Sequence, residues 1–128
     1  VWLTTAEAET APVIKQKFLS ANSRQTVRSR SRTGKYTRQL RSPWTDAWQE
    51  EDAPNPLPMP LQELVSGPAL RRIDKLAEAG DPAAKKLATY WVGQGVGLMN
   101  APTSARSVVF DFMADFADAA ERLGETLG

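Results

Sequence analysis

The 128-residue chain contains no cysteine and no histidine. Without cysteine it can form no disulfide and offers no thiol nucleophile, which is consistent with a cytoplasmic protein. Without histidine it lacks the most common general base and the most common metal ligand in proteins. We therefore expect no metal site within this chain.

Long hydrophobic runs are also missing, because no stretch of about 18 apolar residues is present. We therefore expect no membrane segment, and the N-terminus does not have the shape of a signal peptide. With 41% hydrophobic and 24% charged residues, the composition is that of a globular domain and not of a disordered chain. The chain opens at Val1 in an apolar run and without Met, so we expect it to continue a longer protein.

Acidic residues are absent between Thr10 and Thr45, where nine basic residues lie. The rest of the chain carries seven basic and fifteen acidic residues, so the net charge of +1 hides an asymmetry. A basic block of this kind either binds a polyanion or pairs with acidic residues elsewhere in the fold.

The centre of the basic block has the pattern of a β-hairpin. Residues 26–33 alternate, which predicts an edge strand with Arg28, Arg30 and Arg32 on one face. Gly34-Lys35 then predicts a turn into a second strand at 36–40. We favour a charged edge that pairs with the acidic remainder, because a stacking surface for nucleic acid needs more aromatics than one tyrosine.

The first 22 residues predict a strand followed by helices. Val1–Thr5 is apolar and β-branched, as at the end of a buried strand. Thr4 and Glu7 have capping-box spacing, which predicts a short helix at 5–10. Pro12 suits the first turn of a second helix at 12–21, and the residues expected to be buried there are Val13, Phe18 and Leu19.

Helical signals dominate the rest of the chain. Ser42-Pro43 predicts a short helix at 43–50 that buries Trp44 and Trp48, and the prolines between 52 and 60 predict an extended connector. A short turn at 61–65, a helix from Gly67-Pro68 to Gly80 and another at 82–91 follow. The first of these helices has an apolar face of Leu70, Ile73, Leu76 and Ala77. A final helix begins at Thr103 or Ser104, ends at Gly124 and has an apolar stripe of Val109, Phe112, Met113, Phe116, Ala120 and Leu123.

Residues 90–100 contain three glycines, Gly93, Gly95 and Gly97, around the single amide side chain of Gln94. Glycine lets the backbone approach another surface closely, and an amide can both donate to and accept from the polar edge of a planar heterocycle. The alternative is that the glycines pack helices together while Gln94 faces solvent. Spacing alone leaves both interpretations open.

Four segments, 1–10, 26–40, 56–62 and 91–97, together resemble the C-terminal part of the nitronate monooxygenase family, also called 2-nitropropane dioxygenase-like proteins. The resemblance implies an FMN-dependent (β/α)8 barrel with an added helical subdomain, in which Val1–Thr5 ends the eighth strand. It also implies that Gly93 and Gln94 lie over the flavin. Many relatives have Ala where this chain has Val92. The phosphate-holding pair and the catalytic histidine of the family would precede Val1, so the resemblance implies no catalytic residue within this chain. Helix sides that face the barrel are expected to be exposed in this chain alone.

The expected fold class is mainly α with a short β-hairpin and one terminal strand, as the C-terminal portion of an FMN-binding α/β barrel. Three parts are expected: 1–22 (end of barrel strand 8 and following helices), 23–60 (basic hairpin, short helix and Pro-rich connector) and 61–128 (helical subdomain covering the flavin site). The expected partners are a small-molecule substrate and the missing N-terminal barrel of the same chain, without nucleic acid or membrane.

The resemblance implies that the complete protein oxidises alkyl nitronates with oxygen and that this part alone is inactive. A flavin-dependent enoyl or CoA-thioester reductase of the same superfamily is the alternative. A small nucleic-acid-binding module that uses Arg24–Arg41 is the alternative of another class.

Overall fold

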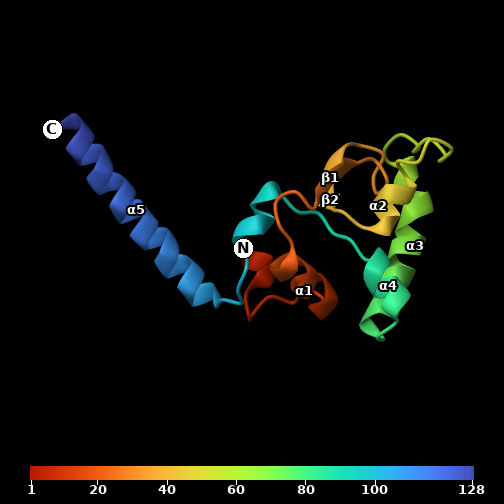
Figure 1. The fold of residues 1–128 in the computed structure, drawn as a ribbon, viewed down its shortest axis with the longest axis horizontal. Coiled ribbons are helices and arrows are strands. Elements are labelled where there is room, and N and C mark those ends of the chain that lie inside the picture. The colour runs from red at the N-terminus through yellow and green to blue at the C-terminus, as the bar shows by residue number, and fades with distance from the viewer.

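A computed structural model of the chain describes all 128 residues. It is mainly helical with one two-stranded antiparallel hairpin, as expected. Helices α1 to α4 and the hairpin gather together, while α5 extends away from them (Figure 1). The elements are the short 3-10 helices η1 (Trp2–Thr4) and η2 (Gln94–Leu98), the strands β1 (Thr26–Ser29) and β2 (Thr37–Leu40), and the helices α1 (Pro12–Ser20), α2 (Pro43–Ala47), α3 (Leu61–Glu78), α4 (Pro82–Leu87) and α5 (Ala105–Leu127).

The predicted terminal strand at Val1–Thr5 is wrong for this structure, because residues 2–4 form η1. A strand needs a neighbour to satisfy its backbone groups. Here Thr5 alone makes an isolated parallel bridge, with Thr103. The hydroxyls of Thr4 and Thr5 instead donate to the carbonyls of Val1 and Trp2.

The short helix predicted at 5–10 is also absent. Glu7 does not close a capping box on its own segment. Its carboxylate accepts a hydrogen bond from the backbone N–H of Ala105 at 2.9 Å, at the first residue of α5. This N–H lowers the pKa of Glu7. A carboxylate at a helix N-terminus is favourable because the first N–H groups have no partner within the helix.

The hairpin pairs Thr26 with Leu40 and Ser29 with Thr37, so each strand is only four residues long. The first strand was predicted to continue to residue 33, but residues 30–36 form the connection. Gly34 takes a φ of 85° there, a conformation that favours glycine. A Cβ at this position would also lie 2.8 Å from the backbone nitrogen of Met59 in the connector.

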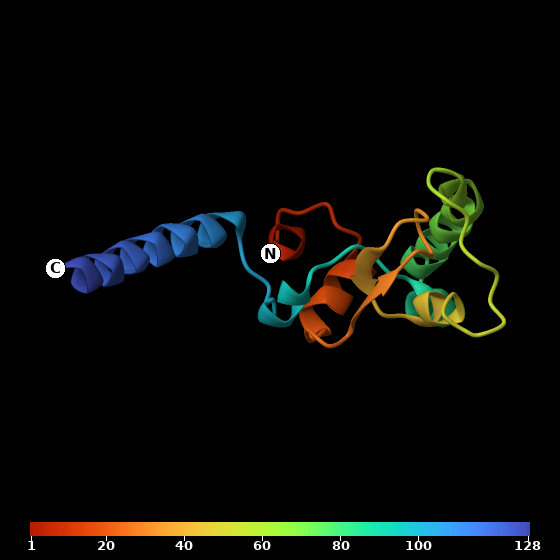
Figure 2. The ribbon, with the colours of Figure 1, turned by 90° about the horizontal axis from the view of Figure 1, so that it is seen from above.

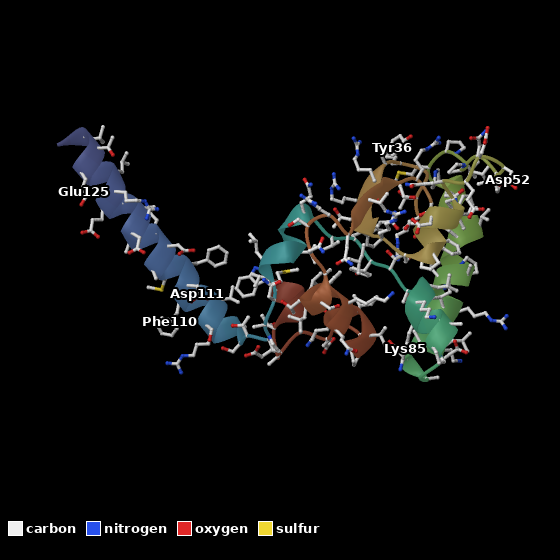
Figure 3. The ribbon with its side chains drawn as sticks, in the orientation of Figure 1. Tyr36, Asp52, Lys85, Phe110, Asp111 and Glu125 are labelled. Carbon is white, nitrogen blue, oxygen red and sulfur yellow. The ribbon has the colours of Figure 1, made fainter.

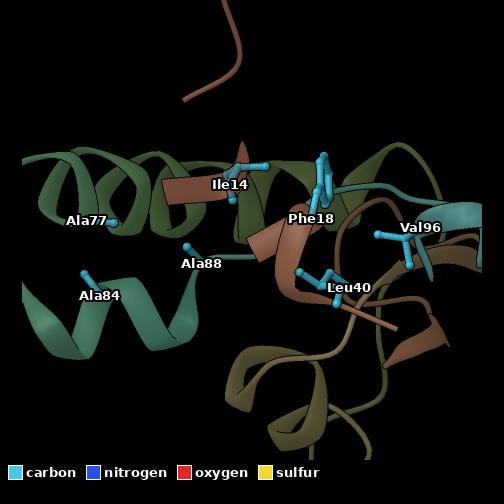
Figure 4. Packing of buried hydrophobic residues seen from close by; sticks show 8 residues of the cluster. Ile14, Phe18, Leu40, Ala77, Ala84, Ala88 and Val96 are labelled. Atoms are coloured by element: carbon cyan, nitrogen blue, oxygen red, sulfur yellow. The ribbon is translucent and has the colours of Figure 1, made fainter. Parts of the chain in front are cut away.

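The buried hydrophobic cluster lies between α1, the hairpin, α3 and α4 (Figure 4). Phe18 is its largest fully buried side chain. Val13 and Leu19, which were predicted to be buried, are only half-buried, and Ile14 takes the inward position instead. Four of the cluster residues are alanines, and the three at α3 and α4 let these helices approach closely but bury little apolar area. The cluster comprises Ile14, Phe18, Ala21, Leu40, Ala77, Ala84, Ala88 and Val96.

Helix α3 is continuous, whereas the sequence predicted a break at Gly67-Pro68. Pro68 lies inside it and removes one backbone hydrogen bond, a cost that tertiary packing can offset. On its predicted apolar face Leu70 and Ala77 are buried, Ile73 is half-buried, and Leu76 is exposed.

Helices α2 and α4 begin where the sequence predicts. Their starts are a capping box at Ser42 and the Asp81 carboxylate, which accepts from the Ala84 N–H at 2.7 Å. Trp44 and Trp48 are only half-buried, with ring centroids 6.0 Å apart. The Pro-rich connector that joins α2 to α3 loops out from α2 and returns to the start of α3 (Figure 2).

Helix α5 begins at the predicted cap, because the Ser104 hydroxyl accepts from the Ser107 N–H at 3.0 Å. It continues through Gly124, where the sequence predicted its end. The predicted apolar stripe is exposed along the helix, and Val108 is the one buried residue of α5. Phe110 points away from the rest of the molecule (Figure 3). None of the helices is long and apolar enough to span a bilayer.

Candidate functional site

An apolar hollow of about 530 Å³ lies between the N-terminal segment, α1 and the glycine-rich segment. Its volume is within the range of small-molecule and cofactor sites. Eight of its ten lining residues are hydrophobic, so it suits a ligand with a large apolar face. The lining residues are Val1, Leu3, Phe18, Trp91, Val92, Gly93, Gly95, Val96, Leu98 and Met99.

The three glycines of this segment have different surroundings. A Cβ on Gly95 would meet nothing within 4 Å, and a Cβ on Gly93 would meet only the Gly95 nitrogen at 4.0 Å. A Cβ on Gly97 would instead lie against Ser23, 2.7 Å from its backbone nitrogen. Gly97 is therefore a packing glycine, while Gly93 and Gly95 present bare backbone to open space beside the hollow.

Gln94 is the first residue of η2, and its side chain is exposed. Of the two predicted site residues, the structure places Gly93 on the wall of the hollow and Gln94 beside it, without lining it. The amide is not buried in the hydrophobic core, so it is accessible to a ligand that extends past Gly93.

The backbone that leads to Gly93 is held against β2 like a third strand. The N–H of Leu40 donates to the Tyr90 carbonyl at 3.0 Å, and the N–H of Val92 donates to the Arg38 carbonyl at 3.2 Å. The Thr89 hydroxyl also donates to the Leu40 carbonyl. Helix α4 was predicted to reach residue 91 and ends at Leu87 because the following residues make these bonds instead.

Arg32 contacts the side chains and backbone of the same segment, residues 89–91. Its guanidinium carbon lies 4.5 Å from the centroid of the Trp91 ring and 5.6 Å from that of Tyr90. It also donates to the Thr89 carbonyl at 2.8 Å. Burial lowers the pKa of Arg32, an effect that the nearby Asp74 carboxylate opposes.

This role of Arg32 was not predicted, because the sequence places it in a row with Arg28 and Arg30. That row does not form. Arg28 lies over the Tyr36 ring at 5.3 Å, and Arg30 donates to backbone carbonyls. No ion pair within 4.0 Å joins these arginines to the acidic remainder, since the one ion pair in the structure joins Arg41 to Asp46 at 2.8 Å. Arg32 nevertheless lies near Asp74 and Glu63 of α3, which favour its charged form.

A second cavity of about 420 Å³ adjoins the hollow at the base of α5, and Val1, Leu98 and Met99 border both. The Trp2 and Phe112 rings stack nearby, with centroids 6.2 Å apart. The apolar surface of the hollow therefore continues towards the exposed face of α5.

Comparison with known proteins gives one relative and one solved structure. The chain is 56% identical over 124 residues to Rv1533 of Mycobacterium tuberculosis, a protein whose name describes it as a monooxygenase. The solved structure is FabK from Thermotoga maritima, with a TM-score of 0.69 and 27% sequence identity. No family model matches the chain.

The aligned region covers most of this chain and a minor part of both comparison proteins. It comprises 96% of this chain and 33% of the Mycobacterium tuberculosis protein, and 94% of this chain and 36% of FabK. The chain thus spans about a third of the length of each. Over nearly all its residues, it is similar in sequence to one part of a protein named as a monooxygenase and shares the fold of one part of FabK.

Proposed function

We propose that this chain covers the flavin of an FMN-dependent oxidoreductase whose barrel portion lies in the rest of the complete protein. The observation that carries the proposal is the bare backbone of Gly93 and Gly95 beside an apolar hollow of cofactor size. The relative named as a monooxygenase supports an oxidoreductase, and the likeness to FabK supports the same architecture.

The residues of the hollow fit a flavin ring. A planar ring needs an apolar wall without protruding side chains, and a Cβ at Gly93 would fill the space that the ring requires. The polar edge of the ring needs a donor and an acceptor, which the exposed amide of Gln94 offers together. When bound, FMN supplies the electron transfer between the substrate and its electron acceptor.

The residues of this chain bind the flavin ring, orient it and shield it from water. Trp91 and Val92 exclude water from one side of the hollow, and the backbone at Gly93 sets the distance of closest approach to the ring. Gln94 orients the ring edge or a bound substrate by hydrogen bonding. We assign the general base of the reaction to the barrel portion, because the family resemblance implies a catalytic histidine before Val1 and this chain contains no histidine.

The substrate that we propose for the complete protein is an alkyl nitronate, oxidised with oxygen. Reduction of an enoyl or CoA thioester is the second candidate, and the structural likeness to FabK is the observation that favours it. We do not favour the nucleic-acid-binding alternative, because Arg32 contacts Trp91 and Thr89 and only Arg28 and Arg30 line a common cavity.

The test is to purify the complete protein, measure the FMN bound per chain and assay both reactions side by side. Oxygen consumption with a nitronate and oxidation of a reduced nicotinamide with an enoyl thioester separate the two candidates. We expect bound FMN and nitronate-dependent oxygen uptake from the complete protein, and neither from the 128-residue chain. A complete protein without flavin, or an isolated chain that retains it, would refute the proposal.

A further inference from the structure

A separate cavity of about 290 Å³ lies between the hairpin connection, the end of α2 and the connector. It shares no residue with the apolar hollow. Its wall is mostly polar, in contrast to the mostly hydrophobic wall of the hollow. The lining residues are Arg28, Ser29, Arg30, Tyr36, Trp48, Gln49, Asn55 and Pro56.

Two arginines enter this cavity, and no carboxylate lines it. Neither arginine has an acidic partner within 4.0 Å, because the one ion pair of the structure is elsewhere. The acidic residues 50–52 follow Gln49 in the sequence but do not line the cavity. The positive charge of Arg28 and Arg30 is therefore available to an anionic ligand.

The two arginines are held in place by uncharged groups. The Nε and one terminal nitrogen of Arg30 donate to the carbonyls of Gly34 and Pro56, at 2.8 and 3.2 Å. Arg28 lies over the Tyr36 ring, and its own carbonyl accepts from the Gln49 amide at 3.3 Å. A guanidinium held by carbonyls and a ring keeps free N–H groups in the fork geometry that phosphate prefers.

The cavity also has rings on which a planar group can stack. Trp48 is half-buried, and its ring lies 6.0 Å from that of Trp44 at an interplanar angle of 56°. Tyr36 is 65% exposed at the rim, on the outer edge of the hairpin (Figure 3). Stacking of a base on such a ring is worth about 1–3 kcal/mol by alanine substitution.

We propose that this cavity binds a nucleoside phosphate, with the phosphate on Arg28 and Arg30 and the base on Trp48 or Tyr36. The connector closes one side through Asn55 and Pro56, so the cavity suits one nucleotide and not a continuing strand. The amides of Asn55 and Gln49 supply hydrogen bonds to a base or ribose. The site does not depend on the flavin proposal, since the two cavities are distinct.

The test is calorimetric titration of the complete protein with ADP, adenosine and inorganic phosphate, with and without added FMN. Arg28→Ala is the decisive variant, because Arg28 holds no connector carbonyl, whereas Arg30 does. Arg24→Ala is its matched control, an exposed arginine beside the same hairpin that does not line the cavity. Trp48→Phe retains a ring and tests stacking without removing charge.

We expect saturable binding of ADP, weaker binding of adenosine and of phosphate, and no competition by FMN. Arg28→Ala should weaken ADP binding at least 10-fold, Trp48→Phe less, and Arg24→Ala less than 2-fold. Equal losses in Arg28→Ala and Arg24→Ala would show diffuse charge attraction and overturn the proposal. Absence of ADP binding, or tighter and steeply salt-dependent binding of single-stranded RNA, would also overturn it.

Discussion

The guanidinium of Arg32 and the indole of Trp91 are stacked, with the guanidinium carbon 4.5 Å from the ring centroid, although the two residues are far apart in sequence. This contact joins the hairpin connection to the segment that carries Gly93. The Arg32 side chain is partly buried, so water competes less for its charge than at a fully exposed cation–π pair, although Trp91 itself is 41% exposed.

Replacement of Arg32 by Ala should lower the free energy of unfolding by about 2 kcal/mol, through the lost stacking and the lost hydrogen bond to Thr89. Arg32→Lys keeps the charge but not the flat stacking surface, so an intermediate loss is expected. Urea unfolding of the two Arg32 variants measures both losses of stability, with Arg24→Ala at an exposed position as the control. An Arg32→Ala variant as stable as the control would contradict the role assigned here.

Gly97→Ala should destabilise the chain by about 1–3 kcal/mol, because its Cβ would be forced against the backbone of Ser23. Gly124→Ala is the matched control: it lies within α5, its Cβ meets nothing, and alanine favours a helix by about 1 kcal/mol. Thermal unfolding of the two variants should therefore shift in opposite directions. Shifts of the same sign would show that Gly97 does not pack as described.

Gly93→Val should reduce the FMN bound by the complete protein at least 10-fold without a comparable loss of stability. The reason is that the new side chain would point into space that is open in this chain and that we assign to the flavin ring. The absorbance of bound flavin and a parallel unfolding curve measure the two effects separately. Retention of FMN by this variant would place the ring elsewhere.

The pKa of Asp74 is raised above its ordinary value of 3.8, mainly by burial, although the Arg32 charge partly opposes the shift. A carboxyl group with a raised pKa binds protons more readily in the folded state, so its contribution to stability falls as pH rises from about 3.8 through the folded-state pKa. The stability difference between the parent chain and Asp74→Asn should accordingly move in favour of Asp74→Asn across that window. Unfolding at several pH values measures it, and Asp118→Asn on exposed α5 is the positional control. A stability difference that stays constant with pH, or moves in favour of the parent chain, would show that burial does not raise the pKa of Asp74.

Phe116→Glu should change the stability of the isolated chain by less than about 0.5 kcal/mol, since the Phe116 side chain is 76% exposed. If the apolar face of α5 packs on the barrel portion, the same substitution should destabilise the complete protein by more than about 3 kcal/mol. Unfolding of both chains, with the exposed Asp118→Asn as control, compares the two values. Equal effects in both would mean that the face stays uncovered.

Local signals predicted much of the fold. Ser42, Asp81 and Ser104 start helices where their side chains predict, and Gly34 lies in the predicted hairpin connection. Pro68 led to the wrong prediction of a helix start, because tertiary packing can offset the cost of a proline inside a helix.

Other features depend on partners that periodicity does not specify. The pattern of Val1–Thr5 predicts a strand, but no neighbouring strand is present to pair with it. The stripe on α5 has the period of a buried face, yet nothing in the chain covers it. Gly93 and Gly97 look alike in sequence, and only the position of Ser23 distinguishes them.

The bond from Glu7 to the first N–H of α5 has a mechanical consequence. Together with the bridge between Thr5 and Thr103, it fixes the root of the last helix to the first residues of the chain. Val1 and Leu3 of the same N-terminal segment line the hollow. Residues 1–7 therefore both anchor the start of α5 and form one wall of that space.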